Sequence, residues 1–174
     1  MLTLVIGGSA SGKSEYAEAH VCTLPGSRIY LATMEPWDGE CRARIARHRA
    51  ARAHRNFTTI ERYRDLEHLP LPPDSNVLLE CLSNLLANER YGTPSRQADQ
   101  VLESLIHLAR QCRHLTVVTN EVFSGGTDYK GDTLAYLRQL AWLNRQLARR
   151  AERVVEVVCG LPNVLKGEGH ENLF

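Results

Sequence analysis

The stretch Gly7-Gly8-Ser9-Ala10-Ser11-Gly12-Lys13-Ser14 fits the pattern G-x-x-x-x-G-K-[ST] of a phosphate-binding loop. The apolar run before it, Leu2–Ile6, predicts a buried strand, and the segment 15–22 after it suits a helix packed on a sheet. Glycines let the backbone curl around a phosphate so that successive N–H groups point inward. The lysine, Lys13, then reaches the β- and γ-phosphates, and the Ser14 hydroxyl holds Mg²⁺. A plain glycine-rich turn is the alternative, but the lysine and serine in register favour a nucleoside triphosphate site.

Composition sets the class of protein. A chain of 174 residues with 43% hydrophobic and 24% charged residues suits one globular domain. We expect a single catalytic domain over residues 1–166 and a flexible tail over 167–174. The net charge of +1 gives no case for nucleic-acid or membrane binding. Nothing predicts a transmembrane helix, and the chain enters its first strand at once, which leaves no room for a signal peptide. These features together predict a cytoplasmic protein.

Five scattered cysteines form no C-x-x-C pair. They predict no disulfide framework and are interpreted as small buried hydrophobes in a reducing compartment. No base is evident beside any of them, so a nucleophilic cysteine is not expected.

Strand-like and helix-like segments alternate along the chain, which predicts an α/β fold: a P-loop, doubly wound, mostly parallel sheet with helices on both faces. Apolar runs predict strands over 2–6, 28–32, 57–60, 77–79, 115–119, 154–159 and 161–166. Helical periodicity predicts helices over 15–22, 40–52, 82–89, 97–112 and 132–152. No linker divides the chain.

A second feature is the arginine-rich segment 42–55. Arg44, His48, Arg52 and Arg55 are spaced by four, four and three residues, so on a helix they share one face. A solvated basic face with an incidental histidine is one interpretation. Few acids accompany these arginines, however, and such a density of guanidinium groups suits a triphosphate or a phosphorylated substrate. A cationic field lowers the pKa of a histidine, which would keep the His48 imidazole neutral and nucleophilic.

Two strand ends carry acids. Glu80 ends an apolar strand, as the Mg²⁺-organising acid of a P-loop protein often does, but it could also stabilise the N-terminus of the next helix. Asn120-Glu121 ends another strand and either faces the same crevice or forms a polar exit from the strand. Trp37 could stack on a planar ligand or close a loop.

These motifs, taken together, resemble the adenosylcobinamide kinase/adenosylcobinamide-phosphate guanylyltransferase family of cobalamin biosynthesis. The segment 44–49, Arg-Ile-Ala-Arg-His-Arg, matches the family's R-I-x-x-H-[RK], which is far more specific than the phosphate-binding loop. The resemblance runs nearly end to end, through the loop 7–14, Ile29-Tyr30-Leu31-Ala32-Thr33, the segment 44–49, Leu78-Leu79-Glu80-Cys81-Leu82, Asn84-Leu85-Leu86, Thr119-Asn120-Glu121-Val122 and Gly160-Leu161-Pro162.

The resemblance implies a RecA-like P-loop fold and a bifunctional enzyme. The kinase would phosphorylate the aminopropanol hydroxyl of adenosylcobinamide with ATP or GTP and Mg²⁺. The second activity would transfer GMP from GTP to that phosphate through a covalent GMP–histidine, which releases pyrophosphate and gives adenosylcobinamide-GDP. His48 matches the histidine. The family's oligomeric ring implies a homo-oligomer, of the trimer type.

By the same resemblance, Glu80 and the backbone around Thr33 would contact the guanine nucleotide. The predicted nucleotide-binding set also includes Arg44, Arg49, Arg52 and Glu61, with Ser14 and Glu80 as Mg²⁺-side residues. Lys13 and His48 are the predicted catalytic residues.

One loop departs from the family. Where many members have G-x-G-x-V-P after T-N-E-V, this chain has Phe123-Ser124-Gly125-Gly126-Thr127-Asp128. This difference bears on substrate contacts and on the balance of the two activities. Two other functions stay open from the residues alone: a P-loop small-molecule kinase without a covalent intermediate, and a nucleotide-dependent regulatory switch. The near-neutral net charge argues against a third, a nucleic-acid-stimulated ATPase. Only the guanylyltransferase requires His48.

Overall fold

A computed structural model describes residues 1–36, 39, 42–43, 45–46, 50, 54–126 and 128–167. Its centre is a seven-stranded sheet. In spatial order the strands are β3 (Thr58–Glu61), β2 (Arg28–Ala32), β4 (Asn76–Leu79), β5 (His114–Asn120), β1 (Leu2–Gly7), β6 (Arg153–Val158) and β7 (Leu161–Lys166). All neighbouring pairs are parallel except β6 and β7, which are antiparallel. The carboxyl ends of the six parallel strands, β3 to β6 in this order, therefore lie along one edge.

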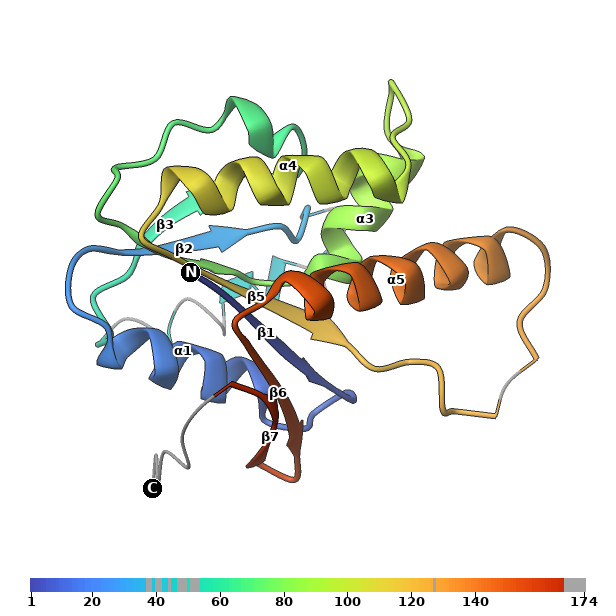
Figure 1. The fold of residues 1–174 in the computed structure, drawn as a ribbon. Coiled ribbons are helices and arrows are strands. Elements are labelled where there is room, and N and C mark those ends of the chain that lie inside the picture. The colour runs from blue at the N-terminus through green and yellow to red at the C-terminus, as the bar shows by residue number, and fades with distance from the viewer. Residues whose placement is uncertain are drawn as a thin grey trace.

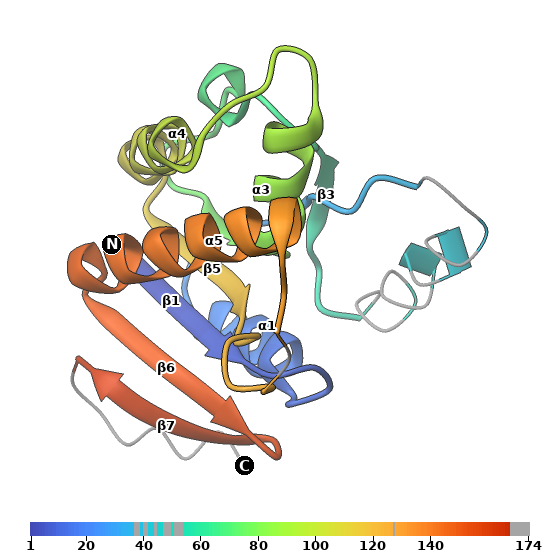
Figure 2. The same ribbon diagram turned by 90° about the vertical axis from the view of Figure 1, so that its right-hand side faces the viewer.

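Helices cover both faces of the sheet (Figure 1). Helix α1 (Lys13–Thr23) lies on one face, and α3 (Leu82–Tyr91), α4 (Ala98–Gln111) and α5 (Gly131–Arg150) lie on the other. A short 3₁₀ helix, η1 (Leu66–His68), packs beside α4. Figure 2 shows the same layers after a quarter turn, with β6 and β7 forming a hairpin at one edge of the sheet, at the lower left of the view.

Two hydrophobic cores follow from the alternation of side chains along the buried strands. Leu4, Leu79 and Val117 point toward α3, α4 and α5, whereas Val5, Leu78 and Val118 point toward α1. Because both faces are covered, the central strands β4 and β5 are buried along nearly their whole length, which explains why they appear in the sequence as continuous apolar runs.

The predicted α/β class, the mostly parallel sheet and the helices on both faces are confirmed. Every predicted strand is present, with ends shifted by at most one residue. Of the predicted helix over 40–52, residues 42–43, 45–46 and 50 are described and are helical, and its other positions lie outside the described residues. Of the predicted tail over 167–174, only Gly167 is described. Neither the domain boundary at residue 166 nor the single-domain organisation is tested, and both stay predictions.

The expectation for the cysteines is wrong at one position. Cys112 is buried, and Cys22 and Cys81 are half-buried, but Cys159 is exposed. Cys159 occupies the two-residue turn between β6 and β7, where its φ of 51° and the φ of 80° at Gly160 give the left-handed conformation of a tight hairpin. The turn, rather than hydrophobicity, places this cysteine at the surface.

Candidate functional site

The predicted phosphate-binding loop joins β1 to α1, at the carboxyl end of a central strand. Gly7 ends β1 without room for a side chain, because a Cβ there would lie 2.4 Å from Ser11 Oγ and 2.7 Å from the carbonyl oxygen of Val157. Gly12 caps α1 with a φ of 88°, which favours glycine. Gly8 differs, since a Cβ would meet no atom within 4 Å. The fold requires glycine at 7 and 12, whereas internal packing does not require it at 8.

Lys13 and Ser14 are the first two residues of α1. The Lys13 ammonium donates a hydrogen bond of 3.0 Å to the carbonyl oxygen of Gly8, so the side chain folds back over the loop. The Ser14 side chain is half-buried beside it. The N-terminus of a helix attracts anions through its unsatisfied N–H groups and its dipole. The geometry is therefore that of an anion site.

The β6–β7 hairpin supports this loop from the side. The Gly160 N–H donates a hydrogen bond of 2.8 Å to the carbonyl oxygen of Ser11, and a Cβ on Gly12 would lie 3.0 Å from Gly160 Cα. This contact gives Gly160-Leu161-Pro162 a physical role that the sequence alone did not reveal: the hairpin turn holds the phosphate-binding loop in place.

A second group of predicted residues lies at the carboxyl ends of β2 and β4. Oε2 of Glu80 accepts hydrogen bonds from the backbone N–H groups of Thr33 at 3.2 Å and of Met34 at 3.3 Å. The buried Thr33 hydroxyl donates to the carbonyl oxygen of Cys81 at 2.9 Å. Glu80 thus orders the backbone that leaves β2, and Thr33 and Glu80, two residues of the predicted nucleotide-binding set, are in contact.

Asn88 of α3 is a residue that sequence reasoning missed. Its Nδ2 donates to the carbonyl oxygens of Thr33 at 2.8 Å and of Tyr63 at 3.2 Å. One amide therefore joins the backbone after β2 to the backbone after β3. The exposed Glu61, the last residue of β3, accepts a hydrogen bond of 3.1 Å from the Tyr63 hydroxyl. No local pattern marks Asn88, because its partners come from two other elements.

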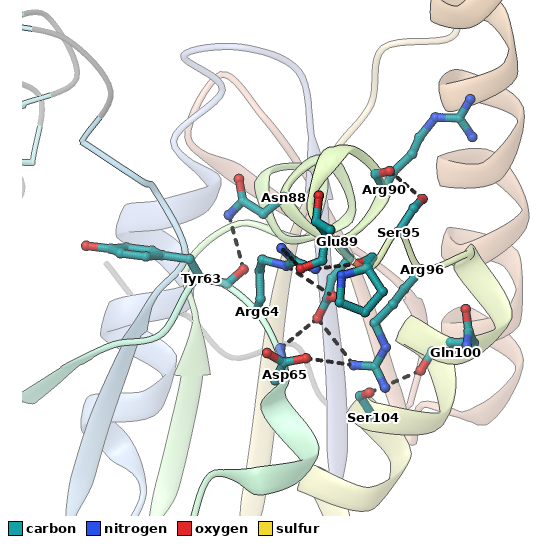
Figure 3. A network of polar contacts seen from close by, with 12 residues as sticks. Tyr63, Arg64, Asp65, Asn88, Glu89, Arg90, Ser95, Arg96, Gln100 and Ser104 are labelled. Atoms are coloured by element: carbon teal, nitrogen blue, oxygen red, sulfur yellow. Dashed lines mark hydrogen bonds and ion pairs between the residues drawn. The ribbon is translucent and has the colours of Figure 1, made fainter.

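A polar network fixes the chain that follows β3 (Figure 3). The buried Glu89 accepts a hydrogen bond of 2.8 Å from the Asp65 N–H, and its carboxylate lies 3.7 Å from Arg64 Nε and 3.6 Å from Arg96 Nη1. Arg96 also forms a two-pronged pair with Glu67, which lowers the pKa of that carboxyl to about 2. The network ties the segment after β3 to α3 and to the loop before α4.

Asn120 and Glu121, at the end of β5, lie beside the phosphate-binding loop, since Asn120 is in register with Gly7. The Asn120 amide donates to Ser83 Oγ at 2.6 Å. The Glu121 carboxylate accepts from Ser124 Oγ at 2.6 Å and from the Phe123 N–H at 2.9 Å, and these hydrogen bonds hold its pKa below the usual range. Glu121 therefore organises the loop that follows it.

Of the predicted basic residues, Arg44, His48, Arg49 and Arg52 lie outside the described residues, as does Trp37. Arg55 is described, and an acidic side chain lies beside it. It forms an ion pair of 3.1 Å with Glu18 of α1. The expectation that this segment has few acids to pair with is therefore wrong for Arg55, because its partner comes from a helix distant in sequence.

Within the described part of the chain, no group of three or more His, Cys, Asp and Glu side chains is arranged to hold a metal ion. No helix among the described residues is long and apolar enough to cross a membrane.

A glycine-rich loop between a buried parallel strand and a helix N-terminus, with a lysine folded over it, defines a nucleotide-binding protein of the P-loop class. The family model "Cobinamide kinase / cobinamide phosphate guanyltransferase" matches residues 3–165, and the chain belongs to this family. The chain is therefore a bifunctional kinase and guanylyltransferase of cobalamin biosynthesis, as its motifs predict.

Three curated relatives match almost the whole chain. The bifunctional adenosylcobalamin biosynthesis protein CobU of Salmonella typhimurium is 34% identical, with 92% of this chain and 97% of the relative covered. CobU of Escherichia coli is 32% identical over the same shares. The corresponding protein CobP of Pseudomonas aeruginosa is 32% identical and covers 97% of this chain and 99% of its own length.

Proposed function

We propose that the chain phosphorylates adenosylcobinamide and then transfers GMP from GTP to the product through His48. In the first step the acceptor hydroxyl attacks the γ-phosphorus of ATP or GTP, and a nucleoside diphosphate leaves. In the second, Nδ1 or Nε2 of His48 attacks the α-phosphorus of GTP and pyrophosphate leaves. The phosphate of the first product then displaces the histidine, which gives adenosylcobinamide-GDP and restores His48.

The observation that carries this proposal is the anion site at the end of β1 in a chain whose match to the family spans residues 3–165. The anion site accounts for the triphosphate. The histidine step rests on the motif Arg44-Ile45-Ala46-Arg47-His48-Arg49, with Arg44, Arg49 and Arg52 as the proposed contacts to phosphate oxygens.

The two described groups of residues support one arrangement of the nucleotide. Strands β1 and β2 are three positions apart in the sheet, which corresponds to about 14 Å at a strand spacing of 4.8 Å. An extended nucleoside triphosphate can span this distance. We therefore place the phosphates on the loop 7–14 and the guanine base near Thr33, Glu80 and Glu61.

Mg²⁺ fits this arrangement. Ser14 offers a hydroxyl oxygen at the start of α1, and oxygen is the ligand that Mg²⁺ prefers. Glu80 follows β4, two strands from β1, and its carboxylate accepts from the backbone of Thr33 and Met34, so we place it at the base rather than on the ion beside Ser14. When bound, the ion would neutralise charge on the phosphates. Lys13 would supply a second positive charge at the γ-phosphate.

The test of the histidine step uses GTP labelled in the α-phosphate. Purified protein is incubated with this GTP and Mg²⁺, denatured and examined for retained label, with His48→Ala and His54→Ala beside the wild type. His54 is an exposed histidine at the end of the same basic segment, so it controls for the loss of an imidazole. Label that is acid-labile, alkali-stable and absent only from His48→Ala is the expected result. An unlabelled wild type that still phosphorylates adenosylcobinamide would contradict the guanylyltransferase mechanism and favour the kinase alone.

We also propose that the chain assembles into a homo-oligomer, as the family resemblance implies. Strand β7 is consistent with this, because it is the last of the described strands in the sheet and exposes Leu161 and Leu165. Light scattering of the purified protein at several concentrations measures the mass, and a monomer at every concentration would overturn the proposal.

A further inference from the structure

A cavity lies beside α5, lined by residues other than those of the phosphate-binding loop and of the polar network around Glu89. It has a volume of about 350 Å³ and lies between α5 and the segment made of residues 122–126 and 128–129, which lies between β5 and that helix in the chain. Its apolar wall comes from α5, through Leu134, Leu137 and Ala141, and its outer wall carries Val122, Phe123 and Tyr129. Arg138 and Asp128 complete the lining with one positive and one negative side chain.

The cavity lies beside the phosphate-binding loop. The Glu121 N–H donates a hydrogen bond of 2.9 Å to the carbonyl oxygen of Gly7, and the cavity wall begins one residue later, at Val122. Figures 1 and 2 show this segment leaving the sheet next to the loop that joins β1 to α1. A molecule in the cavity would therefore approach the γ-phosphate end of a nucleotide bound at Lys13.

The apolar side chains of the cavity are not needed for the cores. On α5, the buried residues Leu140, Leu143 and Leu147 pack into the core, whereas Leu134, Leu137 and Ala141, at helical spacing, are half-buried and lie outside both core clusters of the described residues. Phe123 and Tyr129 are 43% and 42% exposed. An aromatic and aliphatic lining that the fold leaves open beside a catalytic loop is typical of a ligand pocket.

We propose that this cavity binds an edge of the corrin macrocycle of cobinamide and so positions the acceptor for phosphorylation. The inference rests on the proposed kinase function and names the subsite for its acceptor. The macrocycle presents methyl groups and neutral amide arms at its periphery. Apolar side chains match the methyl groups, Arg138 can donate to an amide oxygen, and Asp128 can accept from an amide N–H. A single arginine opposed by an aspartate is a poor site for a second polyphosphate.

The experiment compares Phe123→Ala and Leu137→Ala with Ile106→Ala, a control that truncates a half-buried aliphatic side chain of α4 outside the cavity. Phosphorylation of cobinamide is measured over a range of cobinamide and of ATP concentrations. Equilibrium dialysis with cobinamide alone, followed through its visible absorption, measures binding without catalysis. Circular dichroism checks that each variant is folded.

We expect both cavity variants to raise the KM and the dissociation constant for cobinamide about tenfold or more, with the KM for ATP within about twofold of the wild type. The control should change neither. Cavity variants that bind cobinamide as the wild type does would overturn the inference, and so would a rise in the KM for ATP alone, which would assign the cavity to the nucleotide. A wild type that phosphorylates no cobinamide would instead refute the proposed function.

Discussion

A buried histidine pair, His20 of α1 and His114 of β5, makes the stability of this protein sensitive to acid. His114 of β5 is 4% exposed, and its Nε2 lies 2.9 Å from Thr3 Oγ1. The pKa of His114 is lowered from 6.5 to about 4, chiefly by burial and secondly by the neighbouring His20. The chain terminus acts in the same direction, and Glu152 opposes it.

The sign follows from proton linkage. Between pH 4 and 6.5 the unfolded chain protonates this imidazole while the folded chain keeps it neutral, so the unfolded state binds more protons. The free energy of unfolding is therefore unaffected by His114 above pH 6.5 and falls as the pH drops toward 4. The difference between the two pKa values corresponds to about 3 kcal/mol at the acid end.

Urea denaturation followed by circular dichroism between pH 7.5 and 4 measures this loss. His114→Gln removes the titrating group, so its free energy of unfolding should fall by about 3 kcal/mol less than that of the wild type over this range. His107→Gln, an exposed histidine of α4, is the matched control and should follow the wild type. Identical pH profiles for wild type and His114→Gln would refute the reasoning.

Further predictions concern the loop and the network around it. Gly7→Ala forces a Cβ to within 2.4 Å of Ser11 Oγ and should lower the free energy of unfolding by about 1–3 kcal/mol. Gly8→Ala should change the free energy of unfolding by less than about 0.5 kcal/mol and should weaken nucleotide binding only. Urea melts and nucleotide titrations of both variants check this, and equal destabilisation would contradict it. Glu89→Gln leaves Arg64 and Arg96 without their shared carboxylate and should cost about 3 kcal/mol in the same melts, and an unchanged midpoint would show that the network is dispensable. Asn88→Ala removes two hydrogen bonds to backbone carbonyl oxygens and should raise the KM for GTP more than the KM for cobinamide. Steady-state kinetics with each substrate varied in turn measures both constants, and a larger rise in the KM for cobinamide would contradict the prediction.

Most of the fold could be predicted because the central strands are apolar on both faces. Val77-Leu78-Leu79 and Leu115-Thr116-Val117-Val118-Thr119 are recognisable as buried parallel strands without knowledge of their neighbours. The order β3-β2-β4-β5-β1-β6-β7 was not predictable in the same way, since it depends on which strands pair across the chain. The same holds for η1, whose three residues give no periodic signal.

The candidate site likewise has a part that the sequence predicted and a part that it did not. The loop 7–14 is contiguous, so its motif predicted its geometry. Contacts that join distant elements gave no local signal: Asn88 with Thr33 and Tyr63, and Gly160 with Ser11. The burial of Glu89 is another example, because a glutamate in a helix is ordinarily a surface residue and becomes an ion-pair centre here only when Arg64 and Arg96 approach from other elements.

Helix α5 explains how the acceptor cavity can vary while the nucleotide site is kept. Its Asn144 is buried at the end of β5, where Nδ2 donates to the Asn120 carbonyl oxygen at 3.5 Å and Oδ1 accepts from the Thr119 hydroxyl at 2.8 Å. The inner wall of the cavity, Leu137 and Ala141, lies on this anchored helix and is set by the fold. The outer wall lies on the segment in which the chain departs from the family's G-x-G-x-V-P pattern. We therefore expect a change of sequence there to alter contacts to the acceptor more than the loop 7–14, because the backbone hydrogen bond between Glu121 and Gly7 that joins the two lies at the start of the segment and does not depend on its side chains.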